Sequence, residues 1–102
     1  MINFGIYGLF HPETGELRYI GQTRKSLNKR LKNHLGHSKN IKTNRWVCSW
    51  IRKLLRFGLI PRIQYIQEYK FITNQDLNNA EIYWIKYFRE QGCRLVNVTN
   101  GR

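Results

Sequence analysis

Two short runs near the N-terminus, Phe4-Gly5-Ile6-Tyr7-Gly8-Leu9 and Leu17-Arg18-Tyr19-Ile20-Gly21-Gln22-Thr23, decide the fold of this 102-residue chain. Side chains in both runs alternate with a period of two, which is typical of β-strands. The polar segment between them carries Pro12 and Gly15 where turns favour these residues. We therefore predict an antiparallel hairpin in which Tyr7 and Tyr19 lie on the same face.

A helix is expected directly after the hairpin, with Thr23 or Ser26 as its N-cap. An apolar stripe at positions i, i+4 and i+8 defines its inner face, formed by Leu27, Leu31 and Leu35. At about 100° per residue, Arg30 and His34 fall at the border of this stripe and are expected to face the sheet at the edge of the core. The opposite face is expected to be solvated and carries Lys25, Lys29 and Lys32.

The rest of the chain predicts two more helices and one more strand. After a polar loop at 38–44, with Thr43 or Asn44 as cap, a helix at 45–57 should end at Gly58. We expect its apolar arc to be buried: Trp46, Val47, Trp50, Ile51, Leu54 and Leu55. A strand at 62–69 should join the hairpin, and a last helix should begin after Asn74 and run to about residue 91, with Gly92 as its stop. The fold class is α+β, one domain with a small three-stranded mixed or antiparallel sheet and about three helices.

Glu81 is placed unusually for an acidic residue. In the last predicted helix it falls in the middle of the apolar face, which also carries Leu77, Trp84, Ile85 and Phe88. Burying a carboxylate costs several kcal/mol unless a cation or hydrogen-bond donors satisfy it. Glu81 is therefore either part of a buried salt bridge, a residue at the rim of the core, or a metal ligand.

The charge of the chain points to a polyanionic partner. It has 18 Lys and Arg against 6 Asp and Glu, a net charge of +12 and a pI near 10.2. Nucleic acid is the leading candidate and an anionic membrane the second. No apolar run approaches the roughly 20 residues of a membrane span, and the N-terminus does not resemble a signal peptide, so we expect a cytoplasmic protein. Cys48 and Cys93 lack a CxxC partner, which argues for reduced thiols rather than a zinc site.

The tripeptides Gly5-Ile6-Tyr7 and Tyr19-Ile20-Gly21, followed by Arg30 and His34 one helical turn apart, resemble the GIY-YIG nuclease family. The resemblance extends from Gly5 to Asn97 and implies a divalent-metal-dependent endonuclease acting on duplex or branched DNA. It also implies that Glu81 holds one Mg²⁺ or Mn²⁺ ion. The active site that the resemblance implies consists of Tyr7, Tyr19, Arg30, His34, Glu81 and Asn97. The interval from Gly21 to Arg30 is about one residue longer than in some members, which makes Lys29 a rival for the role of Arg30.

Phosphate contacts are expected from two basic groups. Arg24, Lys25 and Lys29 follow the hairpin, and Arg45, Arg52, Lys53 and Arg56 gather on one side of the second helix. The six acidic residues are too few for a typical two-metal site, which favours a single ion.

Several alternatives stay open at the level of sequence. Either Tyr7 or His34 could be the general base, and Asn97 could position the metal shell or the backbone. A basic module that binds nucleic acid without cleaving it and an RNA-directed nuclease are the competing functions. The biological setting, whether homing, restriction, repair or recombination, is undecided, although the Asn, Ile and Lys content suits an AT-rich genome such as that of a phage. The chain is either a catalytic domain cut from a longer protein or a stand-alone nuclease, and its oligomeric state is open.

Overall fold

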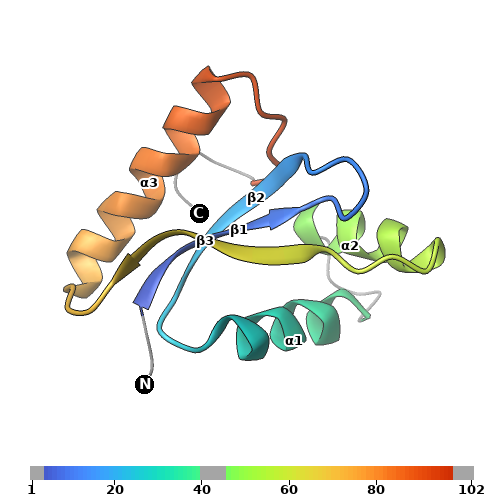
Figure 1. Ribbon diagram of the computed structural model, residues 1–102, viewed down its shortest axis with the longest axis horizontal. Coiled ribbons are helices and arrows are strands. Elements are labelled where there is room, and N and C mark those ends of the chain that lie inside the picture. Colours follow the sequence, from blue (N-terminus) through green and yellow to red (C-terminus); the bar gives the residue numbers. More distant parts are fainter. Residues whose placement is uncertain (1–3, 40–45, 98–102) are drawn as a thin grey trace.

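The computed structural model describes residues 4–39 and 46–97, which form one antiparallel sheet of three strands and three helices (Figure 1). The strands are β1 (Phe4–Phe10), β2 (Leu17–Thr23) and β3 (Arg62–Tyr69). The helices are α1 (Leu27–Ser38), α2 (Trp46–Arg56) and α3 (Asn74–Glu90). The predicted α+β class and the predicted hairpin are confirmed.

The sheet has the order β2-β1-β3, so β2 and β3 are its edge strands. Tyr7 pairs with Gly21 and Leu9 pairs with Tyr19, which places Tyr7 and Tyr19 on one face as predicted. The next pair is Phe10 with Leu17, so β2 contains one extra residue, Arg18, at this point. A bulge of this kind re-aims a side chain, and Arg18 lies with its guanidinium carbon 5.8 Å from the ring centroid of Trp50 on α2.

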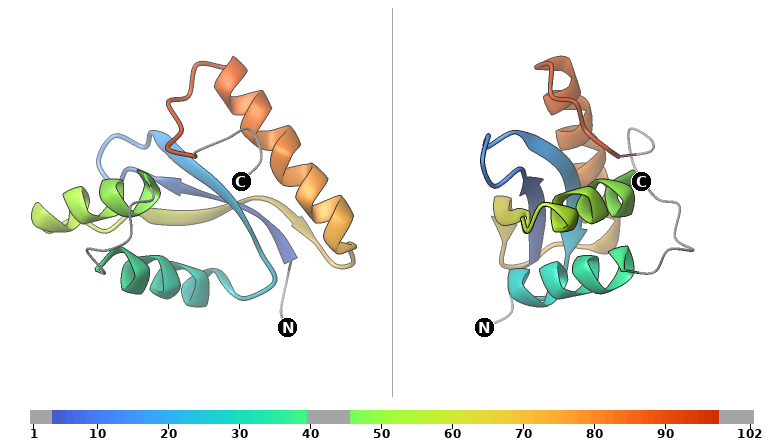
Figure 2. Two further views of the ribbon diagram at one scale, coloured as in Figure 1. Left: turned by 180° about the vertical axis from the view of Figure 1, so that it is seen from behind. Right: turned by 90° about the vertical axis from the view of Figure 1, so that its right-hand side faces the viewer.

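Each face of the sheet is covered by its own apolar cluster. On one face Tyr7 and Leu9 pack with α2, and the leucine stripe of α1 packs around them. The other face, which carries Ile6 and Ile20, packs against Leu77 and Ile85 of α3. The views in Figures 1 and 2 show α3 apart from α1 and α2, close to β2. The fold therefore has three layers: α1 with α2, the sheet, and α3. Tyr7 and Tyr19 lie on the face of the sheet that α1 and α2 cover.

Side chains and glycines fix the ends of the helices. Of the two predicted caps for α1, Ser26 is the one used, because its hydroxyl accepts a hydrogen bond from the backbone N–H of Lys29 at 3.3 Å. Helix α3 begins at its cap Thr73, one residue earlier than expected. Gly58 and Gly92 have φ values of 74° and 93° and end α2 and α3 as predicted. The expected caps Thr43 and Asn44 and the basic residue Arg45 lie outside the described residues.

The prediction that Trp46 is buried is wrong, because 58% of its surface is exposed. On the helix, Trp46 lies about 90° from the middle of the buried arc, on the side of the exposed residues Ser49 and Lys53. The other predicted members of the arc are buried, apart from Leu55, which is half-buried. An exposed indole therefore stands at the start of a basic helix face.

Cys48 and Cys93 are free thiols, as predicted. Among the described residues, no helix has both the length and the hydropathy that a bilayer crossing requires.

We predict that Gly5→Ala lowers the free energy of unfolding by roughly 1–3 kcal/mol, because overpacking a filled interior forces the backbone to shift. A Cβ atom at Gly5 would lie 2.6 Å from the carbonyl oxygen of Gln67 and 2.8 Å from the Tyr65 ring on the neighbouring strand. Gly36→Ala is the matched control, since a Cβ there meets nothing within 4 Å. In a helix this change should stabilise by about 0.5–1 kcal/mol. Urea unfolding measures both, and a Gly5→Ala variant as stable as the parent would contradict the close approach of β1 and β3.

Candidate active site

The hydroxyl of Tyr7 is the point at which the predicted site residues meet. Tyr7 is fully buried, and its oxygen accepts a hydrogen bond from Nε of Arg30 at 3.0 Å. Nε2 of His34 lies 2.6 Å from the same oxygen. Arg30 and His34 reach Tyr7 together because they are four residues apart on α1, and residues at this spacing lie on one helix face. Lys29, the rival for the position of Arg30, is exposed instead.

These contacts constrain where the protons lie. Because the N–H of Arg30 donates to the Tyr7 oxygen, the phenolic hydrogen is free to point elsewhere. The nearest acceptor is Nε2 of His34 when that nitrogen is unprotonated. In this tautomer Tyr7 donates to a neutral imidazole whose proton is on Nδ1.

Tyr19 completes an aromatic cluster with Tyr7 and His34. The ring centroids are 6.3 Å apart for Tyr7 and Tyr19, 5.8 Å for Tyr7 and His34, and 5.4 Å for Tyr19 and His34. The two contacts of His34 have edge-to-face geometry, which aromatic quadrupoles favour. The imidazole is therefore held by packing against both phenols as well as by its contact with one hydroxyl.

Gly21 makes room for the Tyr7 ring. A Cβ atom at Gly21 would lie 2.5 Å from the Tyr7 hydroxyl oxygen and 2.6 Å from the ring carbon that bears it. Tyr7 is paired with Gly21 across the hairpin, so its side chain lies over the β2 backbone at this residue. The need for a glycine at position 21 cannot be recognised from the tripeptide alone, because it follows from the hairpin register that places the Tyr7 ring over this residue.

Glu81 lies on the buried face of α3, as its helical position predicts. Its side chain is 6% exposed, one turn from the buried residues Leu77 and Ile85. Because Glu81 lies in the interior of α3 and is buried, it is not a residue at the rim of the core. The negative charge of Glu81 is one of the causes that raise the pKa of Tyr7, so the two groups are electrostatically coupled.

The prediction that Glu81 is a metal ligand can be compared with the acidic, His and Cys side chains of the described residues. Within residues 4–39 and 46–97, no group of three or more His, Cys, Asp or Glu side chains is arranged to hold a metal ion. Mg²⁺ does not need such a cage, because it is commonly bound through one or two carboxylates while waters and substrate phosphates fill its remaining positions. A role for the Glu81 carboxylate in holding such an ion stays a prediction.

The pKa of Tyr7 is raised above its ordinary value. Burial is the largest cause, and the charges of Tyr19 and Glu81 act in the same direction. Arg30 opposes them through its charge and its hydrogen bond but does not outweigh them. Tyr7 is consequently a neutral phenol at pH 7 and carries a proton that it can donate.

Asn97 acts on the backbone of β2. Its Oδ1 accepts a hydrogen bond from the N–H of Ile20 at 3.0 Å, and its Nδ2 donates to the carbonyl of Ile20 at 2.8 Å. The carbonyl of Asn97 accepts a hydrogen bond from Arg89 on α3, and Figure 1 shows the segment after α3 returning to β2. The buried amide thus completes the sheet edge between Tyr19 and Gly21 and fixes both residues. Of the two roles considered for Asn97, the geometry provides that of positioning the backbone.

The predicted phosphate-binding residues fall into two groups. Arg24 donates a hydrogen bond to the carbonyl of Ile72. It also stacks on Phe4, and its guanidinium carbon lies 4.7 Å from the centroid of that ring. Arg52 donates to the carbonyl of Ser38 and thereby ties α2 to the end of α1. Other basic residues are exposed: Lys25, Lys29, Lys53 and Arg56. Contact with nucleic acid stays a prediction for all of them, and it suits the exposed group best.

The family model described as the GIY-YIG catalytic domain matches residues 3–94. Searches of curated proteins and of solved structures found no significant match.

We predict that Asn97→Ala lowers the free energy of unfolding by about 1–3 kcal/mol, because it leaves a buried N–H and a buried C=O of Ile20 without their partners. Amide hydrogen exchange at Ile20 should accelerate in the same variant. Asn79→Ala, at an exposed position of α3, is the matched control and should change stability by no more than about 0.5 kcal/mol. Parental protection of the Ile20 amide in Asn97→Ala would disprove the assigned contact.

The raised pKa of Tyr7 predicts a loss of stability in alkaline solution. A group whose folded pKa exceeds its unfolded value contributes stability that is complete below the unfolded value, about 10 for Tyr. This contribution falls by up to about 1.4 kcal/mol per pH unit as the pH rises further toward the folded pKa. In Tyr7→Phe the free energy of unfolding should therefore decline less steeply above about pH 10 than it does in the parent. Tyr83→Phe, at an exposed tyrosine of α3, serves as control in guanidinium unfolding and should keep the parental slope.

Proposed function

Since the chain belongs to the GIY-YIG family of nucleases, we propose that it is an endonuclease that hydrolyses DNA phosphodiester bonds with the help of one divalent cation. The observation that carries the proposal is the buried Tyr7 hydroxyl, which is in contact with Arg30 and His34 and coupled to the charge of Glu81. Hydrolysis requires a positioned water, an acceptor for its proton, and positive charge at the phosphoryl oxygens. The site contains a candidate for each requirement.

Tyr7 and His34 act together as the general base. The Tyr7 oxygen takes a proton from the attacking water while its own proton passes to Nε2 of His34 across the 2.6 Å contact. No free phenolate has to form beforehand, which matters because burial raises the pKa of Tyr7. The two residues considered separately as bases thus become one relay, and the Arg30 hydrogen bond stabilises the charge that develops on the phenol oxygen.

Arg30 has a second role at the phosphate. Its Nε is used by Tyr7, whereas in the described part of the chain no protein group accepts a hydrogen bond from its two terminal amino groups. Those groups can bind two phosphoryl oxygens at once, the geometry for which guanidinium is suited. Arg30 thereby places the scissile phosphate beside the hydroxyl that activates the water.

Glu81 would hold the cation, Mg²⁺ or Mn²⁺, which when bound supplies Lewis-acid stabilisation of charge at the phosphate and at the leaving oxygen. The carboxylate is prepared for this task by its position on the buried face of α3. Tyr19 packs against the imidazole of His34 and keeps its ring oriented toward Tyr7. Asn97 holds the strand that carries Tyr19.

The net charge of +12 provides the affinity for DNA, duplex or branched, and the exposed lysines of α1 and α2 are its first contacts. Neutralised phosphates release counterions, so binding should weaken steeply with salt. We place this activity in the cytoplasm, on cellular or phage DNA.

The test offers plasmid, duplex and branched DNA and single-stranded RNA in parallel, with Mg²⁺ or with EDTA. We predict DNA cleavage that EDTA abolishes and that Glu81→Gln slows about 100-fold or more, because the charge that holds the cation is lost. Glu90→Gln, at an exposed position of the same helix, should cleave like the parent.

Undiminished cleavage by Glu81→Gln would overturn the metal assignment. Binding without cleavage of any nucleic acid would identify a non-cleaving module, and cleavage of RNA alone would identify an RNA-directed enzyme.

A further inference from the structure

A cavity lies between the hairpin turn and α2, on the side of the Arg18 bulge. Its volume is about 410 Å³, within the range of roughly 300–1,000 Å³ that is usual for small-molecule pockets. The side chains that line it are those of His11, Glu13, Arg18, Trp50, Lys53, Leu54, Phe57 and Leu59. None of these residues belongs to the Tyr7 site, although Arg18 directly precedes Tyr19 in β2.

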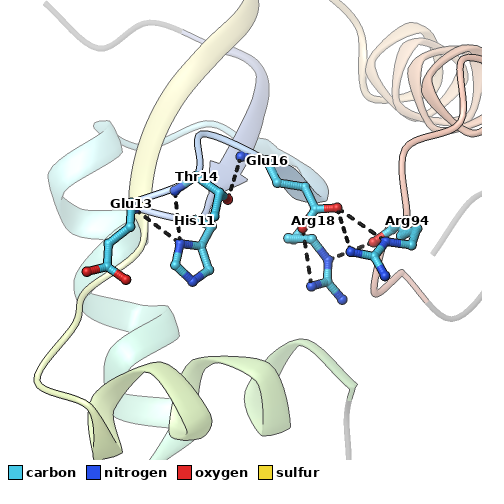
Figure 3. A network of polar contacts seen from close by, with 6 residues as sticks. All are labelled: His11, Glu13, Thr14, Glu16, Arg18 and Arg94. Atoms are coloured by element: carbon cyan, nitrogen blue, oxygen red, sulfur yellow. Dashed lines mark hydrogen bonds and ion pairs between the residues drawn. The ribbon is translucent and has the colours of Figure 1, made fainter.

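The hairpin turn supplies a defined donor and a defined acceptor. Nδ1 of His11 accepts hydrogen bonds from the backbone N–H groups of Glu13 and Thr14 at 3.1 and 3.3 Å (Figure 3). The neutral ring must therefore carry its proton on Nε2, which becomes a hydrogen-bond donor. The Glu13 carboxylate near it is exposed and is therefore able to accept hydrogen bonds from a ligand.

Arg18 is held rigidly at the cavity wall. Its Nε donates to the carbonyl of Arg94 at 2.7 Å, and one terminal nitrogen lies 3.8 Å from the carboxylate of Glu16, as Figure 3 shows. Its guanidinium also stacks over the Trp50 ring. A bulge residue fixed by three contacts makes this wall a built structure rather than a mobile surface.

The opposite wall combines an exposed ring with a cation. Phe57, at the end of α2, is 73% exposed, and the exposed Lys53 lies one helical turn before it. Exposed aromatic rings next to positive charges are the means by which proteins stack unpaired bases and bind the adjoining phosphates. A flat apolar ligand with a polar edge and an attached anion matches all sides of this cavity.

We propose that the cavity binds one unstacked nucleotide of the substrate strand, flanking the phosphodiester at the Tyr7 site. The base stacks on Phe57, its polar edge meets Glu13 and His11, and its phosphate pairs with Lys53. A carboxylate acceptor favours bases with an exocyclic amino group, cytosine or adenine. The position of the nucleotide relative to the cut rests on the proposed function, whereas the binding of a base by the cavity can be tested without cleavage.

The experiment measures binding of a single-stranded oligodeoxycytidine of about 12 nucleotides in EDTA by fluorescence anisotropy, over a series of salt concentrations. Phe57→Ala should weaken binding about tenfold through lost stacking, with an unchanged salt slope. Lys53→Ala should reduce the salt slope by about one, because it removes one phosphate contact. Phe71→Ala removes a ring that is 93% exposed and lies outside the cavity, and it should bind like the parent.

An oligonucleotide of the same length with abasic sites isolates the contribution of the base. The effect of Phe57→Ala should shrink on this probe, since there is little left to stack. Equal binding by Phe57→Ala and the parent on both probes would overturn the proposal, as would an effect of equal size on the abasic probe. Base-dependent binding through Phe57 without cleavage of any nucleic acid would retain the cavity and refute the nuclease. Cleavage of DNA with no effect of Phe57→Ala on binding would support the nuclease and refute the nucleotide-binding cavity.

Discussion

The arrangement of the rest of this structure depends on one phenolic oxygen, that of Tyr7. The Tyr7 hydroxyl is buried, and a buried hydroxyl without partners would cost free energy, so it must be satisfied from within the fold. Arg30 and His34 satisfy it, and to do so α1 must lie across the sheet with one particular face turned inward. Gly21 must also stay without a side chain, because the ring occupies that space. Fold and chemistry therefore share one set of constraints.

Local periodicity was enough to predict the elements and their faces. Alternation in the first two strands places Tyr7 and Tyr19 together, and the 3.6-residue period of the helices correctly puts Arg30, His34 and Glu81 against the sheet. These predictions succeed because they depend on backbone geometry within one element. The proposal that Glu81 of α3 belongs to the same site as Tyr7 came from the resemblance to a family, since spacing within one helix cannot relate two different helices.

The features that escaped prediction depend on contacts between distant segments. The pairing of Asn97 with Ile20 spans 77 residues, and no pattern near either residue announces it. The bulge at Arg18 adds one residue, so that Leu17 and Tyr19, although two residues apart, pack on opposite faces of the sheet, and only the hairpin register reveals it. Trp46 is hydrophobic but exposed, because the part of α2 that the sheet and α1 cover does not extend to its side of the helix. In each case packing between elements, rather than propensity within one, decides the outcome.

The amide of Asn97 has a consequence for how the molecule behaves among its own copies. Strand β2 is an outer strand, and an outer strand with free backbone groups is a template on which another chain can add a strand and begin to aggregate. The N–H of Val96 donates to the carbonyl of Arg18, and the Asn97 amide pairs with both the N–H and the carbonyl of Ile20, so this part of the sheet edge cannot pair with another chain. The residue that holds the strand carrying Tyr19 therefore also protects the protein against strand addition by its own copies.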